Sequence, residues 1–100
     1  MSNPFIKTLR LNILELLNYQ KSRKLMKKLS DMDVLGQIHV IYSVSETKPS
    51  GVEVGEALIY LLDRNFIKEL PLGGITVFAI TEEGKKLLRG IYDGEDTAII

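Results

Sequence analysis

The stretch from Phe78 to Leu88, FAITEEGKKLL, constrains the fold more than any other part of the chain. An apolar run typical of a strand ends at Thr81, whose side chain can cap the first turn of a helix. Two glutamates follow at once, where the helix dipole favours negative charge, and Gly84 lets the helix approach the strands closely. The pattern therefore predicts a strand that runs directly into a helix over residues 82–90, ended by Gly90.

The residues before this junction predict a β-hairpin and another helix. FIKEL and ITVFAI flank PLGG, and Gly73 and Gly74 supply the positive φ that a tight turn needs, so residues 66–80 are expected to form a hairpin. Further upstream, Ser50 and Glu53 form an S-x-x-E capping box. This box predicts a helix over residues 51–65, where Asn65 tolerates the left-handed conformation that ends a helix.

The N-terminal part predicts a helix over residues 4–20 that is apolar around much of its circumference. Its apolar side chains exceed what one face needs, and surplus apolar surface tends to find a partner. We therefore expect a dimer interface on this helix, formed by Leu9, Leu11, Ile13 and Leu14.

Two segments between these helices are harder to assign. Residues 22–30 predict a short helix capped by Ser22, with its cations facing solvent. Residues 33–45 allow two readings. Alternating β-branched and aromatic residues indicate a strand, whereas Val34, Ile38 and Ile41 have helical spacing after a possible cap at Asp33. The neighbouring helices favour the helix.

Composition bounds the class of protein. One hundred residues with 45% apolar content suit one compact domain. The chain has no cysteine, which excludes disulfides and thiolate metal sites. No apolar run is long enough to span a membrane, and the first residues lack the apolar core of a signal peptide. A cytoplasmic protein without a membrane partner is expected.

Nothing in the sequence predicts catalysis or a cofactor. His39 is the only histidine, so a metal site built on several histidines is impossible, and a structural role for this side chain is favoured. No nucleophile motif, phosphate-binding glycine loop or zinc-protease motif is present. We therefore expect a protein that is not an enzyme.

Charge is distributed unevenly although the net charge is zero. Residues 1–28 hold seven cations and one acid, a net charge of +6, and residues 29–100 hold six cations and twelve acids, a net charge of −6. Such an asymmetry can mark an anion-binding face or a solvated basic helix. The basic cluster consists of Arg23, Lys24, Lys27 and Lys28.

Two motifs carry a resemblance to a known family. ALIYLLDRNFI, from Ala57 to Ile67, resembles the end of a recognition helix that runs into a wing, and FAITEEGKKLL resembles the junction that leaves the wing. In this order and separation they resemble winged helix-turn-helix regulators of the PadR and MarR kind. The resemblance implies a mainly α fold with a small β-hairpin (α+β). It also implies a winged-helix domain with an N-terminal helical extension over residues 1–92. The composition of residues 93–100 indicates a separate tail that is acidic and then abruptly apolar. This tail would be disordered, or Ile99 and Ile100 would dock on a partner subunit.

The resemblance further implies a DNA-binding transcriptional regulator that acts as a homodimer on double-stranded DNA. The residues expected to contact DNA are Arg23, Lys24, Lys27, Lys28, Ser50, Tyr60, Arg64 and Lys68. The alternative is a winged-helix module that binds another protein and not DNA. Glu56 favours this alternative, because a carboxylate in the first turns of a recognition helix would face DNA phosphates unfavourably.

Overall fold

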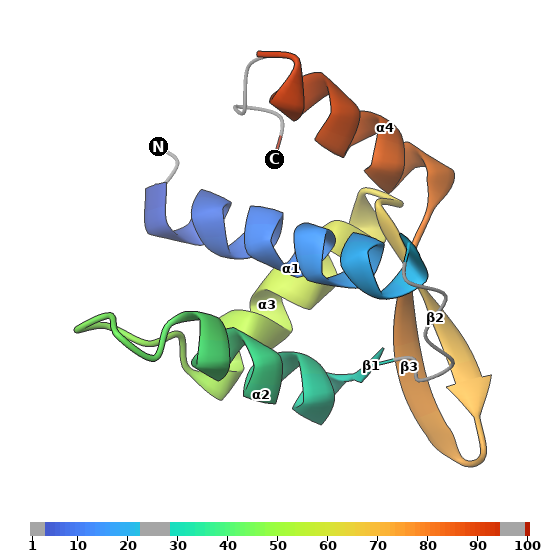
Figure 1. Ribbon diagram of the computed structural model, residues 1–100. Helices are drawn as coiled ribbons and strands as arrows, with labels where there is room; N and C mark the ends of the chain where they lie inside the picture. The colour runs from blue at the N-terminus through green and yellow to red at the C-terminus, as the bar shows by residue number, and fades with distance from the viewer. Residues whose placement is uncertain (1–3, 23–28, 95–99) are drawn as a thin grey trace.

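The computed structural model describes residues 4–22, 29–94 and 100 and shows a mainly helical fold with a small antiparallel hairpin (Figure 1). The elements are α1 (Pro4–Ser22), β1 (Leu29–Ser30), α2 (Asp31–Ile41), α3 (Gly51–Asp63), β2 (Ile67–Leu72), β3 (Ile75–Ile80) and α4 (Glu82–Tyr92). This layout confirms the expected α+β class.

The predicted hairpin is confirmed and belongs to a sheet with the strand order β1-β3-β2. β2 and β3 pair antiparallel from Ile67 opposite Ile80 to Leu72 opposite Ile75. Gly73 and Gly74 make the turn with φ of 56° and 88°, the left-handed values expected of glycine. The two residues of β1 pair with Phe78 and Val77 on the other edge of β3.

The residues predicted to cap the start of α3 and to end it do so in the structure. The Ser50 hydroxyl accepts a hydrogen bond from the Glu53 backbone N–H at 3.1 Å, and the Glu53 carboxylate accepts one from the Ser50 N–H at 2.9 Å. Asn65 has a φ of 63°, and the N–H groups of Asn65 and Phe66 donate to the carbonyls of Leu62 and Leu61. This pair of bonds is the Schellman motif that closes a helix with a left-handed residue.

α2 resolves the ambiguous segment in favour of the helix. Its buried residues Val34 and Ile38 have helical spacing. Tyr42, the residue that follows the last residue of α2, is buried as well. The expected cap at Asp33 is wrong: Ser30 is the N-cap, and Asp33 is the third helical residue, whose carboxylate accepts from the Ser30 N–H.

The short helix expected over residues 22–30 is wrong at its end, because Leu29 and Ser30 form β1. The rest of that expected helix, residues 23–28, lies outside the described ranges.

α4 starts at the predicted cap but extends past the predicted end. The Thr81 hydroxyl accepts from the Gly84 N–H at 3.1 Å and donates to the Asn65 carbonyl at 2.6 Å. The helix continues through Gly90 to Tyr92, and Gly94, with a φ of 94°, follows its cap. Thr81 thereby fixes the start of α4 on the turn that closes α3.

The expected dimer interface is wrong for three of its four residues. Ile13 and Leu14 are 0% exposed and Leu9 is 1% exposed, because all three lie in the core of the chain itself. Leu11 is partly buried against the same core. α1 packs against α2, α3, α4 and β3, which explains why it is apolar around so much of its circumference.

Within the described ranges, no helix combines the length and the apolar character needed to cross a membrane.

Candidate functional site

The outward face of α3 combines exposed aliphatic side chains with acidic ones. It consists of Val52, Glu56, Ile59 and Asp63, spaced i, i+4, i+7 and i+11, all of them exposed. Val52 is 71% and Ile59 is 59% exposed, although both are aliphatic. The opposite face holds Val54, Ala57, Leu58 and Leu61 in the core, so the outward residues cannot turn inward.

The outward face of α3 is acidic as well as apolar. α3 contains no lysine or arginine between Gly51 and Asp63. Residues 51–80, which span α3 and the hairpin, hold two cations and four acids, a net charge of −2. A surface of this sign repels DNA phosphates, and it attracts a positively charged partner.

Two of the residues predicted to contact DNA come before and after α3 in the sequence. Ser50 uses its hydroxyl as the N-cap of α3, so its position has a structural explanation. Lys68 is exposed on β2, next to Glu69, whose opposite charge lowers the positive potential there.

Tyr60 and Arg64 lie beside the outward face and meet an arginine from α1. The guanidinium carbon of Arg10 lies 3.4 Å from the centre of the Tyr60 ring, and that of Arg64 lies 4.7 Å from it. These are cation–π contacts. Since Arg10 covers the ring so closely, a base could not stack on the face that Arg10 occupies.

Arg10 was not among the predicted site residues, although the sequence carries a signal for it. Ile6, Ile13, Leu14 and Leu17 surround its position at helical spacing, so a cation interrupts the inward stripe of α1. The Arg10 guanidinium also donates from Nη1 to the carbonyl oxygen of Ile100 at 3.0 Å.

The other four residues predicted to contact DNA, Arg23, Lys24, Lys27 and Lys28, lie outside the part of the chain that the structure describes. Their contribution to the charge of the chain is fixed by the sequence.

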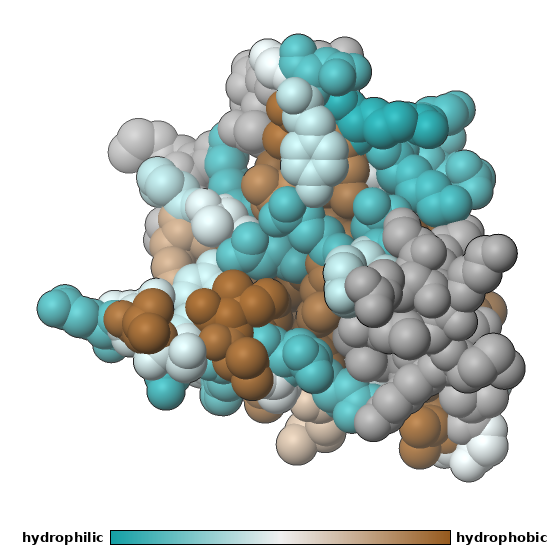
Figure 2. Space-filling model, in the orientation of Figure 1, coloured by the Kyte–Doolittle hydropathy of each residue, from teal (hydrophilic) through white to brown (hydrophobic). Residues whose placement is uncertain are grey.

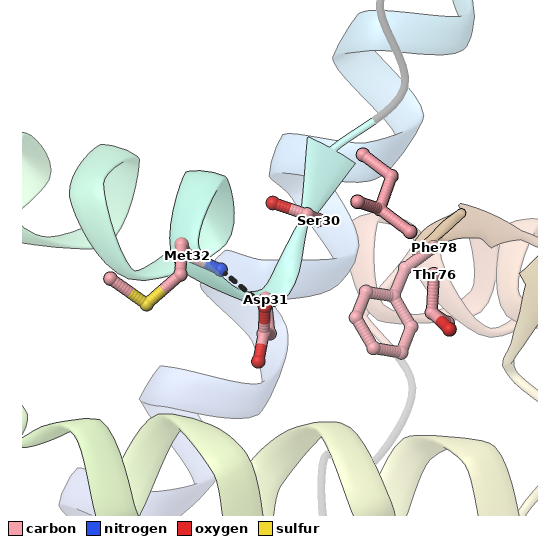
Figure 3. Close-up of a pocket in the computed structure, with 6 residues that line it drawn as sticks. Ser30, Asp31, Met32, Thr76 and Phe78 are labelled. Atoms are coloured by element: carbon pink, nitrogen blue, oxygen red, sulfur yellow. Dashed lines mark hydrogen bonds between the residues drawn. The ribbon is translucent and has the colours of Figure 1, made fainter. Parts of the chain in front are cut away.

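A pocket of about 420 Å³ lies between the start of α2 and β3. Its lining residues are Ser30, Asp31, Met32, Ile75, Thr76 and Phe78. Figure 3 shows Asp31 and Met32 on one wall and Thr76 and Phe78 on the other, with the Asp31 carboxylate accepting from the Met32 N–H at 2.8 Å. The pocket resembles the outward face of α3 in chemistry, because exposed apolar side chains again lie beside a carboxylate.

A second exposed apolar patch lies at the end of α2 and in the turn that follows. Val40, Ile41 and Val44 are exposed there, and Val44 is 95% exposed. Figure 2 shows hydrophobic side chains gathered over this end of the molecule. Exposed aliphatic residues that cluster in this way are typical of protein-binding surfaces.

The polar groups that suggest chemistry at first sight have structural roles. His39 donates from Nε2 to the carbonyl of Pro49 at 2.9 Å, which links α2 to the segment before α3. Tyr42 is buried, contacts the Phe5 ring edge-on and accepts a hydrogen bond from Asn12. Among residues 4–22, 29–94 and 100, no three acidic or histidine side chains come together as a metal site would require.

No protein-family model matches the sequence, and no curated protein matches it significantly.

Proposed function

We propose that this chain is a winged helix-turn-helix module that acts by binding another protein through the outward face of α3. The element order α1-β1-α2-α3-β2-β3-α4 supports the winged-helix part of the proposal, since it brings the two motifs of the sequence resemblance into one hairpin-containing unit. The observation that carries the protein-binding part is the composition of the outward face: two exposed aliphatic and two acidic side chains, with no cation.

Electrostatics favour a protein over DNA as the partner of this surface. A helix that reads the major groove usually presents arginine, lysine, asparagine, glutamine or serine to the base edges, and its surroundings neutralise phosphates. Here Glu56 and Asp63 would face those phosphates. Burial of Val52 and Ile59 against an apolar partner would be favourable, and cations on that partner would complement the two carboxylates. The expected partner is therefore a basic, amphipathic protein segment.

The second candidate function is a homodimeric DNA-binding transcriptional regulator. The excess of six positive charges in residues 1–28 favours it, as does the resemblance to PadR- and MarR-like regulators. In this case the N-terminal cations, rather than α3, would supply the affinity. Replacing Lys24, Lys27 and Lys28 with alanine would then weaken binding to every duplex about equally, and the salt slope would fall by roughly 0.9 for each phosphate that is no longer neutralised.

The test places a photo-crosslinking residue at Ile59 in the full chain, and a matched one at the exposed Lys86 on α4 as control. In an extract of the source cells, the Ile59 position should form a discrete protein adduct that the Lys86 position does not form. The crosslinked protein, once purified, should bind the parent chain directly. Ile59→Asp should weaken that binding by about thirtyfold, the effect of removing a typical interface hot spot.

The same preparation is titrated with duplex DNA over a range of salt concentrations. The protein-binding proposal expects no saturable duplex binding, and Ile59→Asp should change nothing in this assay. Tight duplex binding that falls steeply with salt, together with nucleic-acid adducts at the Ile59 position, would reject the proposal in favour of the regulator.

A further inference from the structure

The pocket between α2 and β3 lies where the chain leaves the sheet. β1 ends at Ser30, opposite Val77, because Ser30 is also the N-cap of α2 and the next residue is already helical. β3 reaches beyond this point through Thr76 to Ile75, its first residue. The volume of the resulting pocket, about 420 Å³, is in the range of about 300–1,000 Å³ that is typical of ligand sites.

The apolar side chains of the pocket are exposed at its mouth and covered deeper in. Met32 is 70% exposed and Ile75 is 55% exposed, whereas Phe78 is 9% exposed. In Figure 3 the Asp31 side chain lies between the Met32 side chain and the Phe78 ring. A ligand with an apolar part would therefore remove exposed hydrocarbon from water at the mouth, which is favourable.

Asp31 gives the pocket a negative charge. It is the charged member among the six described lining residues, and it is exposed. The capping box of α2 is formed by Ser30 and Asp33, so the start of the helix does not depend on Asp31. The Asp31 Oδ1 accepts the Met32 N–H at 2.8 Å, and no donor within residues 4–22, 29–94 and 100 reaches its Oδ2. That oxygen is available to a ligand.

The two chemistries together restrict the occupant. A wholly apolar group would cover the carboxylate without offering it a hydrogen-bond donor, which carries a desolvation cost. An arginine side chain combines an aliphatic part with a planar guanidinium that donates to carboxylates and stacks on aromatic rings. A lysine side chain has the aliphatic part but no planar group. Arginine therefore matches Met32, Phe78 and Asp31 best.

We propose that this pocket binds an arginine side chain of another protein. The guanidinium donates to the Asp31 carboxylate, and the aliphatic part lies between Met32 and Phe78. The residues on either side of that arginine cover Met32 and Ile75 at the mouth, which a small guanidinium compound cannot do. We name this site the arginine pocket. It does not rest on the proposed function of α3, although a basic partner suits both surfaces.

The test titrates the full chain with the capped tripeptide leucyl-arginyl-leucine amide and separately with its citrulline counterpart, in which a neutral urea group replaces the guanidinium. The NMR signals of the Met32 methyl group and the Phe78 ring should move saturably with the arginine peptide. The citrulline peptide should bind about tenfold more weakly, because a hydrogen bond to a charged group is lost. Propylguanidine, which lacks the flanking residues, should also bind more weakly than the arginine peptide.

Matched variants make the assignment specific. Asp31→Asn keeps an oxygen for the Met32 N–H but loses the charge, so it should weaken binding of the arginine peptide about tenfold and leave the citrulline peptide unaffected. Asp93→Asn, which removes an exposed carboxylate at the end of α4, should change neither. Met32→Ala should weaken the arginine peptide severalfold, whereas Val44→Ala, at another exposed aliphatic residue, should not. This second pair serves if Asp31→Asn disturbs α2.

Four results would overturn the proposal: no saturable binding, equal binding of the arginine and citrulline peptides, unchanged binding in both Asp31→Asn and Met32→Ala, or signal changes confined to α3. Propylguanidine that binds as tightly as the arginine peptide would assign the pocket to a small guanidinium compound and overturn the protein partner. The readouts lie in α2 and β3, so failure here would leave the protein-binding proposal for α3 standing, and failure of the Ile59 crosslink would leave the arginine pocket standing.

Discussion

At the scale of single residues, Gly84 shows how tightly the last helix is seated. The position is buried on the first turn of α4, directly over the carbonyl of Phe66. A Cβ at this position would overlap that carbonyl oxygen and would lie 2.8 Å from Ile80 Cγ1. The same carbonyl accepts the Thr81 N–H at 3.0 Å, so it cannot move away without breaking the hydrogen bond that holds Thr81, the N-cap residue of α4.

Gly84→Ala should therefore lower the free energy of unfolding by about 1–3 kcal/mol, as overpacking against rigid backbone does. Gly36→Ala is the matched control: Gly36 lies in α2, where an added Cβ meets nothing within 4 Å. That substitution should raise stability by about 0.5–1 kcal/mol, because alanine favours the helix. Urea unfolding of both variants measures the difference. Equal stabilities would show that α4 can shift away from the turn at little cost.

At the scale of elements, each boundary depends on a few capping groups. α3 begins at Ser50, whose hydroxyl satisfies the Glu53 N–H. Ser50→Ala removes this acceptor and should destabilise the protein by about 0.5–2 kcal/mol. Ser50→Thr retains an oxygen and should recover most of that stability. Thermal unfolding of the three proteins provides the measurement, and a Ser50→Ala variant as stable as the parent would mean that the cap is dispensable.

Local signals explain which elements could be predicted from the sequence. The starts of α3 and α4 and the hairpin turn each depend on residues within a few positions of one another, and all three were predicted correctly. The cap of α2 was missed because Ser30 pairs with Asp33, whereas the usual capping-box signature has glutamate or glutamine at that position. Gly90 was taken for a helix end, yet it is Gly94 that has the left-handed φ typical of such an end.

The features that could not be predicted depend on contacts between residues that lie far apart in the sequence. The apolar circumference of α1 was assigned to a second chain because periodicity does not reveal how many elements of the same chain will cover a helix. Arg10 of α1 contacts Tyr60 of α3 and Ile100, and these three residues lie far apart in the sequence. The outward face of α3 was only partly anticipated: Glu56 was noted, but its neighbours Val52 and Ile59 became meaningful once their exposure was known.

At the scale of the whole molecule, a hydrogen bond between two side chains links the first and last helices. The Tyr92 hydroxyl donates to the Glu15 carboxylate at 2.8 Å, across 77 residues. Desolvation of the hydroxyl, with the hydrogen bond to Glu15 and its negative charge, raises the pKa of Tyr92 from 10.0 to about 12. The folded state therefore holds this proton more tightly than the unfolded state does.

The link between α1 and α4 should weaken in strong base. Its contribution is fully present below pH 10.0, the unfolded value, and is lost as the pH rises through the folded value of about 12. Urea unfolding at stepped pH should show a fall in stability over this window that Tyr92→Phe reduces. Glu15→Gln should move the window downwards by removing the negative charge. Identical pH profiles for the parent and Tyr92→Phe would contradict the assignment.

Among the described residues, the strand order β1-β3-β2 places β2 at one edge of the sheet. Pro71 lies within that strand and has no N–H to offer, and exposed Lys68 and Glu69 put charge beside it. Proline and charge are the means by which natural sheets discourage edge-to-edge pairing. Along β2 the hairpin therefore offers a poor template for edge-to-edge pairing and fibril growth.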